Sequence, residues 1–323
     1  MQAHYLQGES WAAAREAVDW RSRVVTTSEG GVRIYTRKIP LVGTIGYAPL
    51  CLPILGKNAL LNIKAITDTC DDLFAVRIEP EQDVNTIDTQ AIKQQGIIRP
   101  KKSKIQYQST IEIKLDQSED DLLASFSKGM RYNIRKADKR GVKIVPVPAN
   151  EANLATLYDF KTVTSERADH YLRPRAFLMD FWGRLAANDQ AVLLRVEHES
   201  ELVAIGLSAI EGNRAWNIAT GSLRTKRSLA APALMHWEMM KQLKQRNISR
   251  YDLTGISPPA VRADKSNPMN GVDSFKVGFG EQYIHDYPGT FDLVLNKSHY
   301  NRWAQIEQYY VRVKTKLSGK YWW

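Results

Sequence analysis

Cysteine is scarce in this sequence, and long apolar runs are absent. The two cysteines, Cys51 and Cys70, have no histidine partners at metal-binding spacing, so we expect two reduced thiols and neither a disulfide framework nor a zinc site. No segment approaches the ~20 consecutive apolar residues of a membrane span, and the N-terminus lacks the basic start and apolar stretch of a signal peptide. We therefore expect a cytoplasmic protein.

Length and charge narrow the expectation further. A chain of 323 residues with a mixed composition predicts two globular domains, because one domain usually holds ~150 residues. Lys and Arg number 45 against 35 Asp and Glu, a formal net charge of +10. Such an excess favours a polyanionic partner: nucleic acid, anionic lipid headgroups or a diphosphate-bearing substrate. Composition does not separate these three.

Both halves of the chain show the same order of expected elements. The first half predicts a helix over 10–18 with Ser10 as its N-cap, strands near 32–34 and 43–47, a helix over 58–66 and a strand over 73–78. The second half predicts a strand over 110–115, a helix over 128–143, strands over 192–196, 202–210 and 215–219, a helix over 229–246 and a strand over 250–254. Hairpin strands, a helix and a further strand are typical of an acetyltransferase-like (GNAT) unit. The predicted fold class is therefore α/β (α+β) with two tandem GNAT-like domains.

One segment interrupts this pattern. Residues 257–271 contain three prolines and alternating basic and acidic residues, so we expect a long loop there. Long loops in compact domains are often functional.

Several motifs follow one another along the chain. The strand ending at Asp116 is followed by the basic segment Arg131-Tyr-Asn-Ile-Arg-Lys-Ala137, and Gly271-Val-Asp-Ser-Phe-Lys-Val-Gly-Phe-Gly280 stands further on. Together with Tyr287-Pro-Gly-Thr-Phe-Asp292 and the opening Trp11, they resemble the motifs of the FemABX family, aminoacyl-tRNA-dependent peptidyltransferases of peptidoglycan bridge formation. The resemblance implies a first GNAT-like domain over 1–106 plus 288–323, and a second over 107–287.

Two departures qualify the resemblance. Too few residues separate Tyr158 from Arg173 for the helical arm of some members, so the chain resembles the compact arm-less members similar to FemX. The segment Tyr47-Ala-Pro-Leu-Cys-Leu52 lacks the glycine and proline of the family's tight turn. The shape of the first-domain cleft therefore does not follow from the resemblance.

The resemblance implies an enzyme, an aminoacyltransferase. Enzymes of this kind transfer an amino acid from aminoacyl-tRNA to an amine of the stem peptide of a peptidoglycan precursor, and the expected precursor is UDP-MurNAc-pentapeptide or lipid II. We expect a monomer that needs no cofactor and no metal and works in the cytoplasm, at the inner face of the plasma membrane if its acceptor is lipid-linked. The basic tail with Lys314, Lys316 and Lys320, which ends in Trp322 and Trp323, favours either a peripheral membrane contact or a packed aromatic end.

Lys276 is the expected catalytic residue. Acyl transfer passes through an oxyanion, and we expect the Lys276 ammonium, held after a strand, to stabilise it. The neighbouring Phe275 is expected to stack on the terminal adenine of tRNA. Asp252 and His285 are weaker candidates for a general base, because the ester is already activated; we expect Asp252 to fix a loop and His285 to be structural.

The resemblance also assigns residues to precursor binding. Arg173 matches a family arginine that holds a phosphate of the sugar-nucleotide precursor, a task that suits the planar donors of a guanidinium. Arg15 stands where the family has a lysine for the same diphosphate; the other interpretation is an exposed helix arginine. Phe177 replaces a tyrosine of the arm-less members.

The segment 128–143 holds seven basic residues against one acid. Helical spacing brings Arg131, Arg135 and Lys139 onto nearby faces, a strip that fits a phosphodiester backbone. We expect these residues to bind tRNA; the alternative is a solvated helix without a partner.

Two other functions stay open. A CoA-dependent N-acyltransferase of the GNAT type would share the fold, but the segment 224–232 has no glycine for the loop that cradles the CoA diphosphate. A non-catalytic RNA-binding protein would explain the charge but not Phe275 and Lys276.

Overall fold

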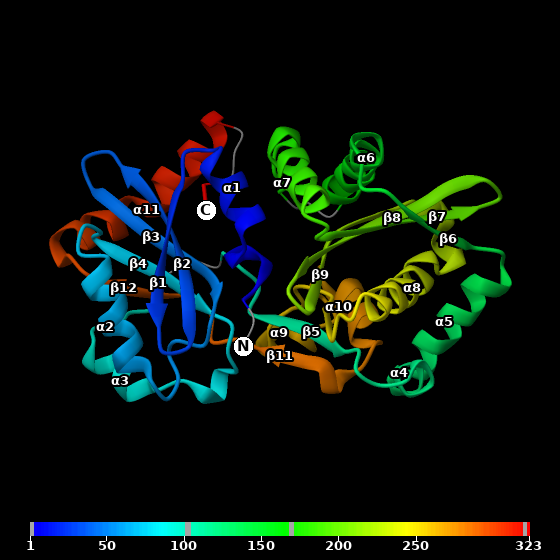
Figure 1. The fold of residues 1–323 in the computed structure, drawn as a ribbon, viewed down its shortest axis with the longest axis horizontal. Helices are drawn as coiled ribbons and strands as arrows, with labels where there is room; N and C mark the ends of the chain where they lie inside the picture. Colours follow the sequence, from blue (N-terminus) through cyan, green and yellow to red (C-terminus); the bar gives the residue numbers. More distant parts are fainter. Residues whose placement is uncertain (1–2, 101–104, 168–170, 319–321) are drawn as a thin grey trace. The chain divides into compact units, whose positions relative to one another are not determined.

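The chain divides into two compact units in the computed structural model (Figure 1). The first unit comprises Met1–Gln108 and Asp286–Trp323, and the second comprises Ser109–His285. These boundaries differ by two residues at each end from the ranges expected from the sequence. The structure describes residues 3–100, 105–167, 171–318 and 322–323.

In the described part of the chain, the first unit contains a five-stranded sheet with the order β1-β2-β3-β4-β12. Its strands are β1 (Arg21–Thr27), β2 (Gly30–Ile39), β3 (Gly43–Cys51), β4 (Ala75–Pro80) and β12 (Phe291–Val294). The first three are antiparallel neighbours, whereas β3 and β4 run parallel and β12 is antiparallel to β4. A parallel pair needs a crossover connection, which helix α2 (Ala59–Thr69) provides.

One face of this sheet forms the apolar core of the first unit. Val32 and Ile34 of β2 share a buried cluster with Ile63 of α2 and with the cysteines Cys51 and Cys70. Both cysteines are free thiols, as expected. The other helical elements of this unit are η1 (Tyr5–Gln7), α1 (Glu9–Glu16), η2 (Val84–Thr86), α3 (Thr89–Gln94) and α11 (Lys297–Ser318).

The opposite face of the sheet carries a buried ion network around Arg77 of β4. Its guanidinium donates to both carboxylate oxygens of Asp292 on β12, over 2.7 and 2.8 Å, and also pairs with Glu307 on α11. Arg77 and Asp292 are both fully buried. The network therefore ties the C-terminal elements β12 and α11 to the strands that precede them by some 200 residues of chain.

In the described residues, the second unit contains a seven-stranded sheet with the order β11-β5-β10-β9-β8-β7-β6. Its strands are β5 (Ser109–Lys114), β6 (Lys143–Val147), β7 (Ala191–His198), β8 (Glu201–Glu211), β9 (Arg214–Ser222), β10 (Arg250–Asp252) and β11 (Ile284–Asp286). Neighbours from β6 to β9 are antiparallel, and β10 is parallel to β9 but antiparallel to β5. In each unit, a parallel pair thus lies next to antiparallel hairpins.

Helices cover both faces of the second sheet (Figure 1). On one face lie α5 (Lys128–Lys139) and α8 (Ala231–Gln245), whose apolar residues join the main core of the unit. On the other lie α6 (Glu151–Arg167) and α7 (Arg175–Ala187). The remaining helical elements are α4 (Glu119–Ser125), η3 (Arg224–Leu229), α9 (Pro259–Arg262), α10 (Asn270–Val277) and η4 (Glu281–Tyr283).

Some element boundaries differ from the prediction. Helix α1 begins at Glu9 with Gly8 as its N-cap, and Ser10 is buried inside the helix instead of capping it. The helix expected over 128–143 ends at Lys139, because Gly141 turns the chain with a φ of +75° into strand β6. The loop expected over 257–271 contains α9 and the beginning of α10.

The segment around Lys276 is a helix and not a strand. Phe275 and Phe279 are four residues apart, and their ring centroids lie 5.6 Å from each other, so both rings meet on one side of the chain. In so short a segment, alternation and helical spacing predict the same apolar positions. The expectation that a strand holds Lys276 is therefore wrong, because helix α10 holds it.

Candidate functional site

The candidate site lies at the carboxyl end of β10 in the second unit. The parallel pairing of β10 with β9 runs from Arg250 to Asp252 and stops there. Beyond it, Thr254 has a left-handed backbone with a φ of 60°, and its hydroxyl donates to the carbonyl of Asn217 on β9 over 3.2 Å. The backbone therefore bends out of the strand at Thr254 and bonds to β5 again only at Ile256, so the carbonyls of Thr254 and Gly255 lie in a bend between the two.

Asp252 fixes this bend. The side chain is buried, and its Oδ1 accepts hydrogen bonds from the Thr110 hydroxyl and, over 2.5 Å, from the backbone N–H of Thr254. These bonds give Asp252 the loop-fixing role that we expected.

Lys276 reaches the same bend from the last turn of α10. Its Nζ donates to the carbonyl oxygens of Thr254 and Gly255, each over 2.8 Å. An ammonium group has three N–H donors, so these two bonds leave one donor for a further acceptor. The site therefore presents a positive charge whose position is fixed by backbone atoms.

The surroundings of Lys276 change its acidity. Burial lowers the pKa of Lys276 to about 8, against the opposing charges of Asp252 and Asp273; the nearby ammonium of Lys161 on α6 contributes to the lowering. The group is mostly protonated at neutral pH but loses its proton more readily than an exposed lysine. Perturbed groups of this kind are frequent at functional sites.

Buried hydrogen bonds link three polar side chains near α10. His236 Nδ1 of α8 is 3.1 Å from the Tyr251 hydroxyl oxygen, and the Ser208 hydroxyl donates to the same oxygen over 3.3 Å. Burial, and then the charge of Lys276, lower the pKa of His236 to about 3. The imidazole is therefore neutral at neutral pH.

Phe275 belongs to the packing around these side chains. Its ring is partly buried and lies 5.8 Å from the ring of His236 and 5.6 Å from that of Phe279. The structure thus gives Phe275 a role in anchoring α10. Its stacking on a tRNA base stays a prediction.

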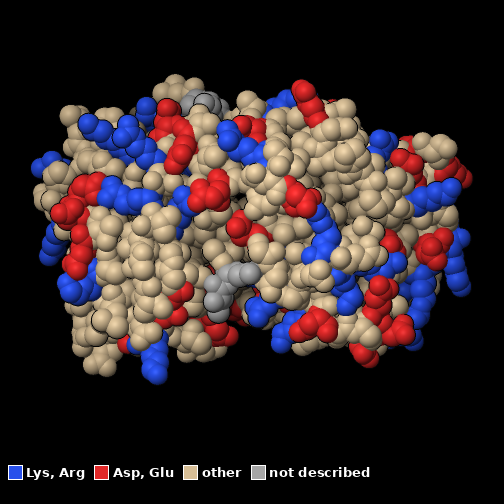
Figure 2. Space-filling view, viewed as in Figure 1, with Lys and Arg blue, Asp and Glu red and all other residues tan. Residues whose placement is uncertain are grey.

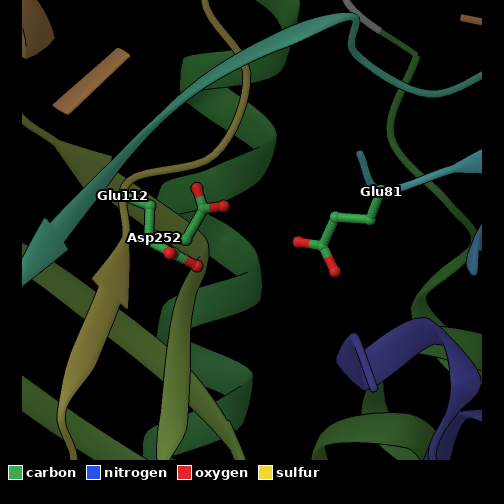
Figure 3. A group of neighbouring side chains, drawn as sticks. All are labelled: Glu81, Glu112 and Asp252. Atoms are coloured by element: carbon green, nitrogen blue, oxygen red, sulfur yellow. The ribbon is translucent and has the colours of Figure 1, made fainter. Parts of the chain in front are cut away.

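Two carboxylates lie side by side where β5 pairs with β10 (Figure 3). Glu112 and Asp252 face one another in the register of these strands; Glu81, drawn in the same figure, belongs to the first unit. Like charges in this position repel each other. Glu112, however, is paired with Arg214 over 2.5 Å and with Arg250 over 3.1 Å, so these arginines already satisfy its charge.

Arg173 and Phe177 lie together at the beginning of α7. The guanidinium carbon of Arg173 is 5.2 Å from the ring centroid of Phe177, a cation–π contact. Phe177 is buried, so its ring orients the arginine but offers no hydroxyl to a ligand. Precursor binding by both residues stays a prediction.

Arg15 is buried in the first unit, and the alternative of an exposed helix arginine is wrong. Only 2% of the residue is exposed, and its guanidinium carbon lies 4.0 Å from the ring centroid of Trp20 and 5.9 Å from that of Tyr35. The structure therefore gives Arg15 a packing role. Its contact with a diphosphate stays a prediction.

The basic helix α5 carries five of the seven predicted cations, because Arg140 and Lys143 follow its end. Arg135 and Lys139 are exposed, and Figure 2 shows Lys and Arg side chains gathered over this part of the second unit. Arg131 differs, since its guanidinium donates to the backbone carbonyls of Ala124 and Phe126. The exposed pair is thus the better candidate for a phosphate backbone.

The C-terminal residues form a packed aromatic end, one of the two predicted alternatives. Trp322 and Trp323 are both buried; Arg37 lies 4.0 Å from the ring centroid of Trp322, and Arg77 lies 4.5 Å from that of Trp323. Lys320 falls outside the described residues. In the part of the chain that the structure describes, no helix is long and apolar enough to cross a membrane.

The segment expected to hold CoA in a rival enzyme has a compact backbone. It forms the 3-10 helix η3, followed by Ala230 with a left-handed φ of 56° as the N-cap of α8. Lys226 of this segment pairs with Glu201 on β8 over 2.8 Å. The exposed pair holds the segment against the sheet.

Comparison with known proteins shows similarity over nearly the whole chain. A family model described as an acetyltransferase (GNAT) domain matches residues 124–265, within the second unit. A lipid II:glycine glycyltransferase of Staphylococcus epidermidis is 22% identical over 399 aligned positions, which cover 98% of this chain and 94% of the relative. The enzyme of the same name from Staphylococcus aureus is 21% identical with the same coverage.

A solved structure supports the same architecture. The crystal structure of FemX matches with a TM-score of 0.77 at 18% identity, over 94% of this chain and 95% of that chain. The predicted α/β class with two GNAT-like domains is thereby confirmed. The relatives are named as transferases, and the alignment of 399 positions shows that they contain residues for which this shorter chain has no counterpart.

Three features of the site escaped the sequence analysis. The pairing of Glu112 with two arginines and the buried His236 both depend on contacts between distant segments. Lys161 did leave a signal, because it follows the apolar Leu154 and Leu157 at helical spacing. A search for charged residues within apolar helical spacing would have found it.

Proposed function

We propose that this chain, which resembles the FemABX family over its whole length, transfers an amino acid from aminoacyl-tRNA to an amine of a peptidoglycan precursor. The names of the curated relatives favour lipid II as the acceptor and glycine as the amino acid. The observation that carries the proposal is the ammonium of Lys276, fixed by two carbonyls at the end of β10 with one donor left over.

The reaction is an acyl transfer. The acceptor amine attacks the ester carbonyl carbon of the aminoacyl-tRNA, so that a C–N bond forms and the carbonyl oxygen becomes negative. The C–O bond to the terminal ribose then breaks, the ribose oxygen takes the proton lost by the amine, and tRNA leaves. A donor aimed at the oxyanion contributes roughly 3 to 4 kcal/mol, and the third N–H of Lys276 is that donor.

The proposal needs no dedicated general base. Asp252 is engaged by Thr110 and Thr254, and His236 is buried behind Tyr251. Because the ester is already activated, positioning of the amine supplies much of the rate.

Donor binding is assigned to the exposed cations of α5. Replacing Arg135 and Lys139 together by glutamine should weaken tRNA binding and lower the slope of log affinity against log salt by roughly 1.5 to 2 units, because each phosphate contact releases counterions. Titration of charged or uncharged tRNA at several salt concentrations measures this slope.

A matched control removes the same two positive charges from another part of the protein. Arg21 and Lys38 are exposed on β1 and β2 of the first unit, and replacing both by glutamine should leave the slope nearly unchanged. Equal slopes for the two double variants would remove α5 from the tRNA site.

Acceptor binding is assigned to Arg173. Arg173→Ala should raise the KM for a phosphate-bearing precursor about tenfold or more and leave tRNA affinity nearly unchanged, because it removes a charge-assisted contact to one substrate. The comparison uses the full precursor and its phosphate-free peptide. If both acceptors lose activity equally, Arg173 does not recognise phosphate.

A CoA-dependent N-acyltransferase is the second candidate, favoured by the GNAT family match. The compact, glycine-free segment of η3 speaks against it, since CoA enzymes of this fold bind diphosphate on open backbone amides. Calorimetric titration with acetyl-CoA, precursor and charged tRNA separates the two. We expect binding of the last two only, and binding of acetyl-CoA alone would overturn the proposed function.

A further inference from the structure

Lys161 occupies the core-facing side of helix α6. Leu154 and Leu157 are buried, Lys161 follows four residues after Leu157, and the buried Ser165 follows four residues later, so these four side chains share one face of the helix. Lysine seldom occupies such a position without a partner. Its placement therefore calls for a reason other than solubility.

The helix brings Lys161 to the candidate site. At Gly221 of β9, an added Cβ would lie 2.6 Å from Cβ of Phe160 and 2.7 Å from its backbone carbon, so only glycine permits this close approach of α6. Lys161 is the next residue. Its ammonium lies near enough to Lys276 for its charge to act on that group.

The described residues supply no partner for the Lys161 ammonium. It forms no hydrogen bond and no ion pair among them, and burial lowers its pKa. The acid closest in sequence, Asp159, pairs with Arg175 on the exposed side over 3.2 Å. Lys161 is only partly exposed, and a cation without a described partner is unfavourable there, all the more because it lies near a second cation. A bound anion would give the Lys161 ammonium a partner.

We propose that Lys161 adds an anion-binding position beside the Lys276 site, which holds the phosphate of the terminal nucleotide of the donor; this inference rests on the proposed tRNA donor. Lys276 donates to the carbonyl oxygen of the ester on one side of the terminal ribose. Lys161 binds the phosphate on the other side. The two lysines thereby fix the reacting nucleotide at both ends.

The test compares two small probes and needs no turnover. Adenosine 5′-monophosphate should bind to the wild-type protein roughly 10- to 100-fold more tightly than adenosine, as expected for a charge-assisted contact. Lys161→Met should abolish this difference. Calorimetry or NMR titration measures both affinities. Equal binding of the two probes to the wild type, or an unchanged preference in Lys161→Met, would overturn the proposal.

The controls separate binding from folding. Lys114→Met removes an exposed lysine of β5 in the same unit and should keep the preference for the phosphate. Lys161→Met should melt at or near the wild-type temperature, because it removes a charge that has no described partner. A lower melting temperature with intact probe binding would mark Lys161 as structural and overturn the site. Lys161→Gln, which keeps a polar end, should lose the preference in the same way.

The anion site and the proposed function can fail separately in these experiments. If the preference depends on Lys161 but no charged tRNA serves as donor, the anion site stands and the proposed donor is wrong. If transfer occurs and the probes bind equally, the anion site alone is wrong.

Discussion

Replacing Lys276 by methionine is expected to lower kcat about 10²- to 10³-fold, with both substrate affinities changed less than about tenfold. Methionine keeps most of the length and the apolar stem of the side chain but has no N–H donor. The interaction that disappears is made only when the carbonyl oxygen becomes negative. Single-turnover kinetics with charged tRNA and precursor measures the loss.

The fold should tolerate this substitution. The folded-state pKa of about 8 lies below the ~10.4 of an unfolded lysine, so between these values the folded chain binds fewer protons, and below pH 8 the buried charge destabilises it. Methionine removes that cost and also the two hydrogen bonds to Thr254 and Gly255. Because these effects oppose each other, the melting temperature should change little.

Two further readouts identify the charge as the active feature. Lys276→Arg should recover little activity, because its planar fork cannot place a compact charge at the same point. In the wild type, kcat should fall as pH rises through about 8, where Lys276 loses its proton. Other titratable groups also lie near the Lys276 ammonium: Asp252, Asp273, Lys161 and the neutral His236. Near-normal turnover of Lys276→Met with a normal melting temperature would remove Lys276 from catalysis.

Replacing Arg77 by methionine is expected to destabilise the first unit by about 3 to 5 kcal/mol, because it leaves the buried carboxylate of Asp292 without its partner. In the described part of the chain, Asp292 would keep a side-chain hydrogen bond from the Tyr300 hydroxyl, over 2.8 Å. The loss should fall on β12 and α11, which the network joins to β4. Urea unfolding gives the free energy, and hydrogen exchange locates the loosened elements.

An exposed ion pair provides the matched control. Arg23 forms two bonds of 2.7 Å with Asp72, but both side chains are at least one-third exposed. Arg23→Met should cost less than about 1 kcal/mol, because solvent screens the pair. If the two variants lose similar stability, burial does not determine the strength of the Arg77 network.

The order of the elements could be predicted because their patterns are local. Alternation around Ile111 and Ile113 and the apolar stripe of α8 identify β5 and the long helix without tertiary information. Four edge strands were missed: β1, β6, β11 and β12. Strands β11 and β12 have only three and four residues, too few for a clear pattern. In β1 only Val25 and Thr27 are buried, and β6 contains Pro146, so neither shows the clear alternation of a central strand.

The candidate site could be predicted in its residues but not in its geometry. The motif around Lys276 identified the residue. Its two carbonyl partners depend on the left-handed backbone of Thr254, which the sequence does not indicate because threonine rarely adopts that conformation. Arg15 shows the opposite case. Arginine is mostly exposed, and its burial depends on the rings of Trp20 and Tyr35.

The central claim is tested most directly by incubating the protein with lipid II or UDP-MurNAc-pentapeptide and a panel of separately charged tRNAs, and then measuring the mass of the acceptor. The account predicts an acceptor heavier by one aminoacyl residue with at least one charged tRNA, and no product with uncharged tRNA or with the Lys276→Met protein over the same time. An acceptor that keeps its mass with every charged tRNA, or gains an acetyl group from acetyl-CoA instead, would contradict it.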